Sequence, residues 1–159
     1  MGKCSICGSR AVIRIPYARI NLCEKHFIEY YERRIERTIA RYDLVSKGMK
    51  VVIALSGGKD SASLAYVFNK IASKYDLKLV ILHIDLGISD YSIKAKEVVK
   101  EFSKIVKIPT VIISIKEILG LGIPELAKLS RRPTCSVCGL VKRYVMNAFA
   151  IEIEADAVC

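Results

Sequence analysis

The stretch from Val51 to Phe68, VVIALSGGKDSASLAYVF, indicates the fold class of this 159-residue chain. Its first five residues are apolar and mostly β-branched, which favours a buried strand. Its last residues place apolar side chains at the spacing of a helix. Between the two lies a Ser-Gly-Gly-Lys-Asp-Ser turn, residues 56–61. The central question is therefore what such a turn binds at the end of a buried strand.

The composition of this turn is typical of a phosphate-binding site. Gly57 and Gly58 let backbone N–H groups approach a ligand closely, and the unpaired N–H groups at the start of the next helix attract an anion. Lys59 adds charge, and hydroxyl donors are available from Ser56, Ser61 and Ser63. A metal ion between the Asp60 carboxylate and the phosphates would explain an acidic residue here. The Walker pattern is absent, and an ordinary turn with a capping aspartate is the alternative.

The sequence around the turn alternates between predicted strands and helices. The expected strands are residues 50–55, 77–85 and 110–115, with a fourth beginning at 155; the expected helices run from the turn to about 74 and over 92–106, 123–130 and 138–153. Strands that are apolar throughout and alternate with helices predict an α/β fold with a parallel sheet. Ligands of such sheets bind beyond the carboxyl ends of the strands. For the 92–106 helix, the buried candidates are Ile93, Val98, Val99, Phe102, Ile105 and Val106.

Four residues near the N-terminus have the spacing of a metal site. Cys4 and Cys7 are spaced C-x2-C, and Cys23 and His26 are spaced C-x2-H. Three thiolates and an imidazole can close a tetrahedral, structural Zn²⁺ site. The alternative is four incidental residues. A helix is expected to follow over residues 24–45 and to end at Ser46-Lys47-Gly48.

The charge and cysteine content restrict the partners and the compartment. The formal net charge is +10, and residues 1–50 contain 11 Lys or Arg against 5 Asp or Glu. This surplus favours a polyanion such as RNA, with a solvated lysine-rich surface as the alternative. The N-terminal helix contains four arginines, which are expected to face either solvent or RNA: Arg33, Arg34, Arg37 and Arg41. We expect no membrane span or signal peptide, and a reducing cytoplasmic location in which six cysteines serve as ligands or reactive thiols.

The turn also resembles the signature of a known family. An apolar strand followed by S-G-G-x-D-S is similar to the PP-loop ATP pyrophosphatases, whose sheet is of the adenine nucleotide alpha hydrolase-like type. This resemblance implies that the turn, Ser56, Gly57, Gly58, Lys59, Asp60 and Ser61, binds ATP phosphates with Mg²⁺. It also implies that backbone atoms of Ala54 and Ile84 hold the adenine. His83 and Asp85 flank that position, where a packed or capping role is expected for the histidine.

A second stretch, RRPTCSVCGLVKRYVMNAFA over residues 131–150, narrows the resemblance. It is similar to the C-x-x-C-G-x-x-[KR]-R block of the tRNA 2-thiouridine synthetases of the TtuA, TtcA and wobble-uridine type. There two such cysteines, here Cys135 and Cys138, hold a [4Fe–4S] cluster with a third cysteine. By the same resemblance Lys142 and Arg143 lie at the nucleotide, and Lys142 serves the reaction together with Asp60, Cys135 and Cys138. From the residues alone, a redox-active pair or a shared zinc pair also fits the two cysteines.

The resemblance implies an activity and a set of partners. ATP adenylates the C2 oxygen of a tRNA uridine, and sulfur from a thiocarboxylated ubiquitin-like carrier protein then replaces that oxygen; the longer enzymes are expected to be homodimers. The expected domains are a zinc-finger-like module over 1–27, a connecting helix over 28–48 and a PP-loop domain over 49–159 that looks incomplete at its C-terminus. Other predictions are a cytidine thiolase of this family or a non-catalytic, zinc-stabilised RNA- or nucleotide-binding fragment.

Overall fold

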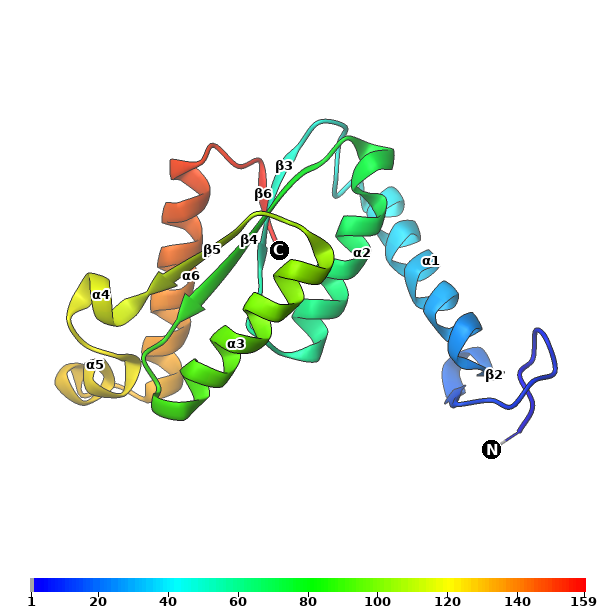
Figure 1. The fold of residues 1–159 in the computed structure, drawn as a ribbon, viewed down its shortest axis with the longest axis horizontal. Coiled ribbons are helices and arrows are strands. Elements are labelled where there is room, and N and C mark those ends of the chain that lie inside the picture. The colour runs from blue at the N-terminus through cyan, green and yellow to red at the C-terminus, as the bar shows by residue number, and fades with distance from the viewer. Residues whose placement is uncertain (1) are drawn as a thin grey trace. The chain divides into compact units, whose positions relative to one another are not determined.

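The computed structural model describes residues 2–159, which form two compact units, residues 2–45 and residues 46–159. Figure 1 shows an N-terminal hairpin and helix followed by a sheet covered by helices. The helix expected to connect the two parts is α1, Glu24–Tyr42, and it belongs to the N-terminal unit. It ends at Asp43 rather than at 46–48, because Asp43 adopts the left-handed conformation that terminates the helix.

The N-terminal unit is built on a short hairpin. Strands β1, Ile13–Ile15, and β2, Ile20–Leu22, pair antiparallel around the single turn η1, Pro16–Ala18. Ile15 and Leu22 are buried and pack with Cys4, while Arg14 and Asn21 face each other on the opposite side of the pair. This core is small, although Ile13, Ala18 and Ile20 pack partly against it, which makes the hairpin dependent on another source of stability.

The second unit confirms the predicted α/β fold with a parallel sheet. Its strands are β3, Lys50–Ala54; β4, Lys78–Asp85; β5, Thr110–Ser114; and β6, Ala157–Val158. All three pairs are parallel, and the order across the sheet is β5-β4-β3-β6. The helices are α2, Lys59–Tyr75; α3, Ser89–Val106; α4, Ile115–Leu119; α5, Ile123–Ser130; and α6, Thr134–Glu152.

Helices cover both faces of this sheet (Figure 1). Helix α6 packs on one face, where Ala150 joins Val52 and Leu82 in one buried cluster. Helices α2 and α3 cover the other face and contact β3 and β4 there. Because both faces are covered, β3 has no alternation of polar and apolar residues, and Val51, Val52 and Ile53 are all buried.

The burial predicted for α3 is partly wrong. Val99 and Val106 are buried, but Ile93, Val98 and Ile105 are 60%, 46% and 76% exposed. The helix presents only one narrow stripe to the sheet, in which Ser92, Val99 and Val106 recur every seven residues. Apolar residues beside this stripe therefore stay in solvent. Helix α4 was not predicted, because five residues are too few to show a helical period.

Four of the helices end at a residue other than glycine in the left-handed conformation. These caps are Asp43, Asp76, Lys107 and Arg131, with φ of 48°, 52°, 54° and 52°. Each cap donates its backbone N–H to a carbonyl of the preceding turn, at Ile39, Ala72, Ser103 and Ala127 respectively. No helix within residues 2–159 is both long and apolar enough to span a bilayer.

Candidate functional site

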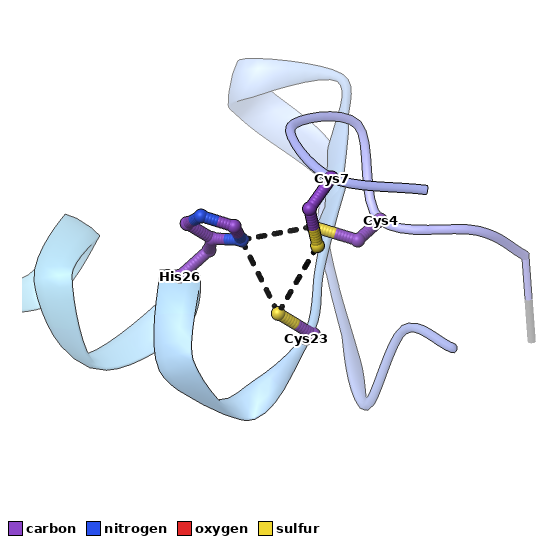
Figure 2. A group of neighbouring side chains, drawn as sticks. All are labelled: Cys4, Cys7, Cys23 and His26. Carbon is purple, nitrogen blue, oxygen red and sulfur yellow. Dashed lines mark hydrogen bonds between the residues drawn. The ribbon is translucent and has the colours of Figure 1, made fainter. Parts of the chain in front are cut away.

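The four N-terminal ligand candidates converge on one point. Their ligand atoms all lie within 4.8 Å of one another, which within residues 2–159 is true of this group of metal-binding side chains only (Figure 2). Nδ1 of His26 lies 3.4 Å from Sγ of Cys4 and 3.3 Å from Sγ of Cys23, and the Cys7 and Cys23 sulfurs are 3.8 Å apart. A tetrahedral ion with metal–sulfur bonds of about 2.3 Å has ligand–ligand edges of about 3.8 Å. The arrangement therefore fits a four-coordinate metal.

Local structure brings these ligands together and favours the thiolate form. Gly8 has φ of +74° and donates its N–H to Cys4 O, which closes the turn between Cys4 and Cys7. Cys23 caps α1 and His26 lies in its first turn. Burial raises the pKa of the Cys4 thiol, but hydrogen bonds from the backbone at Cys7, Cys23 and Ile6 and from the His26 side chain outweigh it and lower the pKa to about 5. A thiolate is the form that binds a metal.

The turn after β3 is held by its own serines. The Ser61 hydroxyl donates to Gly58 O and accepts from Ser56 N, so the Ser56 hydroxyl donates to Ser61, at 3.0 Å. Gly58 N in turn donates to Ser56 Oγ. Ser63, one of the three hydroxyl donors that the sequence makes available, donates to Lys59 O within its own helix. Two of the three serines therefore shape the turn, and the third is bonded within α2.

Glycine is required at position 57 for two reasons. Its φ is +85°, and a Cβ there would lie 3.2 Å from Ala95 O and 3.3 Å from Ala95 Cα on α3. Gly58 is the N-cap of α2 and has no side chain to accept from the first N–H groups of the helix. The turn thus leaves helix-terminal donors available to an anion.

Lys59 and Asp60 pair with each other at the start of α2. Lys59 Nζ donates to Asp60 Oδ1 at 2.7 Å, although both side chains are about nine-tenths exposed. The hydrogen bond from Lys59 to Asp60 raises the pKa of the lysine. Both charges are free to turn toward a phosphate and its metal ion, since no burial holds the pair.

A hollow lies beside the turn at the carboxyl edge of the sheet. Its lining includes Ala54, Ser56 and His83 from the sheet edge, Ser92 from α3 and Lys142 from α6. Ile84 also lines it, so the predicted adenine contacts and the predicted lysine meet in one place. Sequence patterns did not indicate the wall formed by Tyr91, Ser92, Ala95 and Met146, because it is created by packing between distant segments.

The carboxylate of Asp85, which flanks the hollow, already has partners within the protein. Its carboxylate accepts from Gly87 N at 3.0 Å and pairs with Lys96 Nζ at 3.0 Å. Burial raises the pKa of this carboxyl, but the bonds from Gly87, Lys96 and Ser92 outweigh it, so the pKa is lowered. Asp85 therefore holds the β4–α3 connection in place.

The second cysteine pair lies in the first two turns of α6. Cys135 is exposed, and Cys138 packs partly against the cluster of Leu86, Ile123 and Val137. Within residues 2–159, no third cysteine, histidine or carboxylate joins them at metal-binding distance. Cys159 lies at the end of β6, with its sulfur 3.7 Å from Val52 O. Arg143 lies along α6 close to Gly139 and is not part of the hollow's lining.

A family model for the PP-loop domain matches residues 28–133, which include the turn and most of the sheet. The chain belongs to the PP-loop family. A second model, described as the N-terminal LIM domain of the 2-thiouridine synthetase TtuA, matches residues 3–28 and so covers the four metal-ligand candidates. The resemblance seen in the sequence is thereby confirmed.

Curated proteins similar to this PP-loop chain have names that refer to tRNA thiolation. It is 49% identical over 156 residues to the tRNA-5-methyluridine(54) 2-sulfurtransferase of Pyrococcus horikoshii, covering 98% of this chain and 48% of that protein. The enzyme of the same name from Thermus thermophilus is 38% identical, with 94% and 45% covered. The chain thus spans about half the length of the curated relatives it matches.

Two solved structures share the fold of this chain. The U34-tRNA thiolase NcsA from Methanococcus maripaludis, described with its [4Fe–4S] cluster, superimposes with a TM-score of 0.86 at 28% identity, over 99% of this chain and 52% of that one. The NH3-dependent NAD synthetase of Campylobacter jejuni superimposes with a TM-score of 0.55 at 16% identity, over 84% of this chain and 54% of that one, and shares the fold alone.

Proposed function

We propose that this PP-loop chain acts in ATP-dependent tRNA 2-thiolation, in which a uridine C2 oxygen is adenylated before sulfur replaces it. The observation that carries the proposal is the hollow at the carboxyl edge of the sheet. It brings the serine-braced turn next to Ile84 on one side and Lys142 on the other. The names of the relatives from Pyrococcus and Thermus supply the class of substrate.

The turn and Asp60 are proposed to hold the triphosphate. The first N–H groups of α2 bind phosphate oxygens, and Lys59 turns from Asp60 to the phosphates. Asp60 is then left as the carboxylate ligand for Mg²⁺, which supplies neutralisation of the phosphate charge when bound. The exposure of the Lys59–Asp60 pair supports this exchange of partners.

Lys142 is proposed to stabilise the group transfer. The uridine C2 oxygen attacks the α-phosphorus of ATP, the bond to the β-phosphate oxygen breaks, and pyrophosphate leaves. A sulfur nucleophile then attacks C2, and the C2–O bond breaks to release AMP. Lys142 lines the hollow from the sheet face opposite α3, where its ammonium would stabilise negative charge on the transferring phosphoryl group.

The origin of the AMP oxygen tests this scheme. A tRNA transcript made with uridine labelled with ¹⁸O at C2 is incubated with the chain, ATP, Mg²⁺ and sulfide. Mass spectrometry of the AMP is expected to show one ¹⁸O per thiolated uridine, because the oxygen leaves with the adenylate. Thiolation with unlabelled AMP contradicts the adenylation, and AMP release without tRNA shows simple hydrolysis. The absence of any thiolated product contradicts the proposed activity of this chain.

Zinc is proposed for the N-terminal quartet, because three sulfurs and one imidazole nitrogen at tetrahedral spacing are the ligand set that Zn²⁺ prefers. The residues described do not fit a complete [4Fe–4S] site. Cys135 and Cys138 supply two thiolates, and Cys159 lies elsewhere in the sheet. No chemical step above depends on a cluster.

The sulfur carrier protein, the homodimer and the cytoplasmic location stay predictions from the resemblance.

The outer face of the N-terminal hairpin is proposed to contact the tRNA backbone. Residues 2–23 contain four cations and no Asp or Glu: Lys3, Arg10, Arg14 and Arg19. None of these four forms an ion pair within residues 2–159. On α1, by contrast, Arg33 pairs with Glu29 and Arg34 lies over the Tyr17 ring at 5.6 Å. The hairpin cations are therefore the more available to phosphates.

A charge-matched comparison tests which arginines bind RNA. Replacing Arg10, Arg14 and Arg19 by Gln is expected to reduce the slope of log K against log salt by about one per lost phosphate contact. Replacing Arg33, Arg34 and Arg41 removes the same charge and is expected to change the slope less. Fluorescence titrations of tRNA at several salt concentrations measure both. Equal slopes for the two triple variants would show that only net charge matters.

A further inference from the structure

His83 occupies a position that an apolar residue would be expected to fill. It is the sixth residue of β4, and its neighbours Leu82 and Ile84 point to the α6 face. Side chains alternate along a strand, so His83 points to the α3 face. It is only 3% exposed. A polar ring at such depth needs a partner for each of its nitrogens.

One ring nitrogen of His83 forms a hydrogen bond to the residue that precedes the turn. Nδ1 lies 2.8 Å from Leu55 O, the carbonyl that immediately precedes Ser56. A carbonyl only accepts, so Nδ1 carries the proton of this bond. In the neutral imidazole, Nε2 is then an acceptor with a free lone pair. The ring thus links the end of β3 to β4, beside the bond from Leu55 N to Leu82 O.

The other ring nitrogen has no partner in the protein. Nε2 is buried and forms no hydrogen bond within residues 2–159. The hydroxyl of Ser92, an α3 residue that lines the hollow beside the turn, accepts from Ile88 N and bonds to the Asp85 carboxylate. His83 lines the same hollow as Ser56, Ile84 and Lys142. A buried, unpartnered acceptor on a residue that lines a hollow indicates a donor supplied by whatever fills that hollow.

We infer that Nε2 of His83 accepts a hydrogen bond from the nucleoside part of the bound nucleotide. The inference rests on the proposed binding of ATP at this edge of the sheet. Adenosine offers three donors of this kind: the 6-amino group and the 2′- and 3′-hydroxyls. His83 is then a positioning residue with two bonds. One orients the first peptide of the PP-loop, and the other selects a ligand with a donor at the matching place.

Two conservative variants separate these bonds. In His83→Asn the side-chain amide nitrogen lies close to the position of Nδ1, so the donor to Leu55 O is kept and the Nε2 acceptor is lost. In His83→Gln the longer side chain brings its amide oxygen near the position of Nε2, so the acceptor is kept. A role limited to holding the PP-loop predicts that His83→Asn behaves as the wild type. A contact between Nε2 and the ligand predicts that His83→Asn binds the ligand more weakly than the wild type and that His83→Gln does not.

Calorimetric titrations with four nucleotides identify the donor. The chain and both variants are titrated with ATP, inosine triphosphate, 2′-deoxy-ATP and 3′-deoxy-ATP, each with Mg²⁺. The wild type is expected to bind the analogue that lacks the relevant donor about tenfold more weakly than ATP. His83→Asn is expected to bind ATP about tenfold more weakly and to lose this discrimination, whereas His83→Gln retains it. The donor is the group missing from the analogue that the wild type binds more weakly than ATP and that His83→Asn binds as well as ATP.

Several results would overturn the inference. If His83→Asn keeps the wild-type ratio for all three analogues, a buried water and not the nucleotide satisfies Nε2. Thermal melts establish that each variant is folded. If His83→Asn does not fold, equal binding of ATP and all analogues by the wild type is the contradicting result. A wild-type chain that binds no nucleotide refutes the proposed function as well, whereas nucleotide binding without this discrimination refutes only the role of His83.

Discussion

Cys4→Ser is expected to abolish metal binding and to unfold the hairpin of residues 2–23, while the sheet unit stays folded. The sulfur of Cys4 is buried among the ligands and lies 3.4 Å from Nδ1 of His26. Binding of structural zinc is worth on the order of 10 kcal/mol in modules of this size. The hairpin core, formed by Cys4, Ile15 and Leu22, is too small to replace that contribution.

Metal analysis and limited proteolysis measure this effect. The wild type is expected to carry about one zinc per chain and to resist cleavage before α1 until a chelator is added. Cys135→Ser is the matched control, because it makes the same chemical change at an exposed cysteine outside the quartet. Full zinc content in Cys4→Ser would contradict the assignment. Equal zinc loss in Cys135→Ser would show that the metal is bound at the other pair.

Asp60→Ala is expected to weaken Mg²⁺-dependent ATP binding by about tenfold to a hundredfold. Binding of ATP without the metal is expected to be unchanged or stronger, because Lys59 is released from its 2.7 Å pair with Asp60. Calorimetry with Mg²⁺ and with a chelator separates the two effects. A parallel loss under both conditions would mean that Asp60 shapes the turn and does not bind the metal.

Ser63→Ala is the matched control for this experiment. Its hydroxyl lies one turn along the same helix but donates to Lys59 O, so no contact with the nucleotide is lost. ATP binding by Ser63→Ala is expected to equal that of the wild type with and without Mg²⁺. A large loss in this variant would show that the bonds within the first turn of α2, and not Asp60, determine affinity.

Local patterns in the sequence were sufficient for most of the fold. The strand expected at 50–55 is β3, Lys50–Ala54, and the helix expected at 123–130 is α5, because each is a buried or periodic run bounded by turn residues. Burial on α3 was predicted less well. Which apolar residues of a helix face the sheet depends on how the helix is rotated against it, and Ile105 shows that hydrophobicity alone does not decide this.

In the candidate site, too, features that depend on local spacing were predicted and features that depend on tertiary packing were not. The quartet of Cys4, Cys7, Cys23 and His26 was predicted from spacing, since each pair is local and its partners need only the hairpin to meet. A packed or capping role was expected for His83, but its bond to the carbonyl before the turn was not predicted. Its ring position depends on the register that sets Leu82 opposite Ala54 and so brings Leu55 O within reach. That register is a contact between segments about thirty residues apart in the sequence.

The left-handed caps at Asp76 and Lys107 have a consequence for protein engineering. Each holds a side chain in a backbone conformation that costs roughly 1 kcal/mol more for such a residue than for glycine. Both residues precede a strand of the parallel sheet, and so lie at its amino edge, opposite the hollow. These two caps and the ligand hollow therefore lie at opposite edges of the sheet. Glycine at these two caps offers a route to a more heat-resistant chain whose nucleotide edge keeps its native residues.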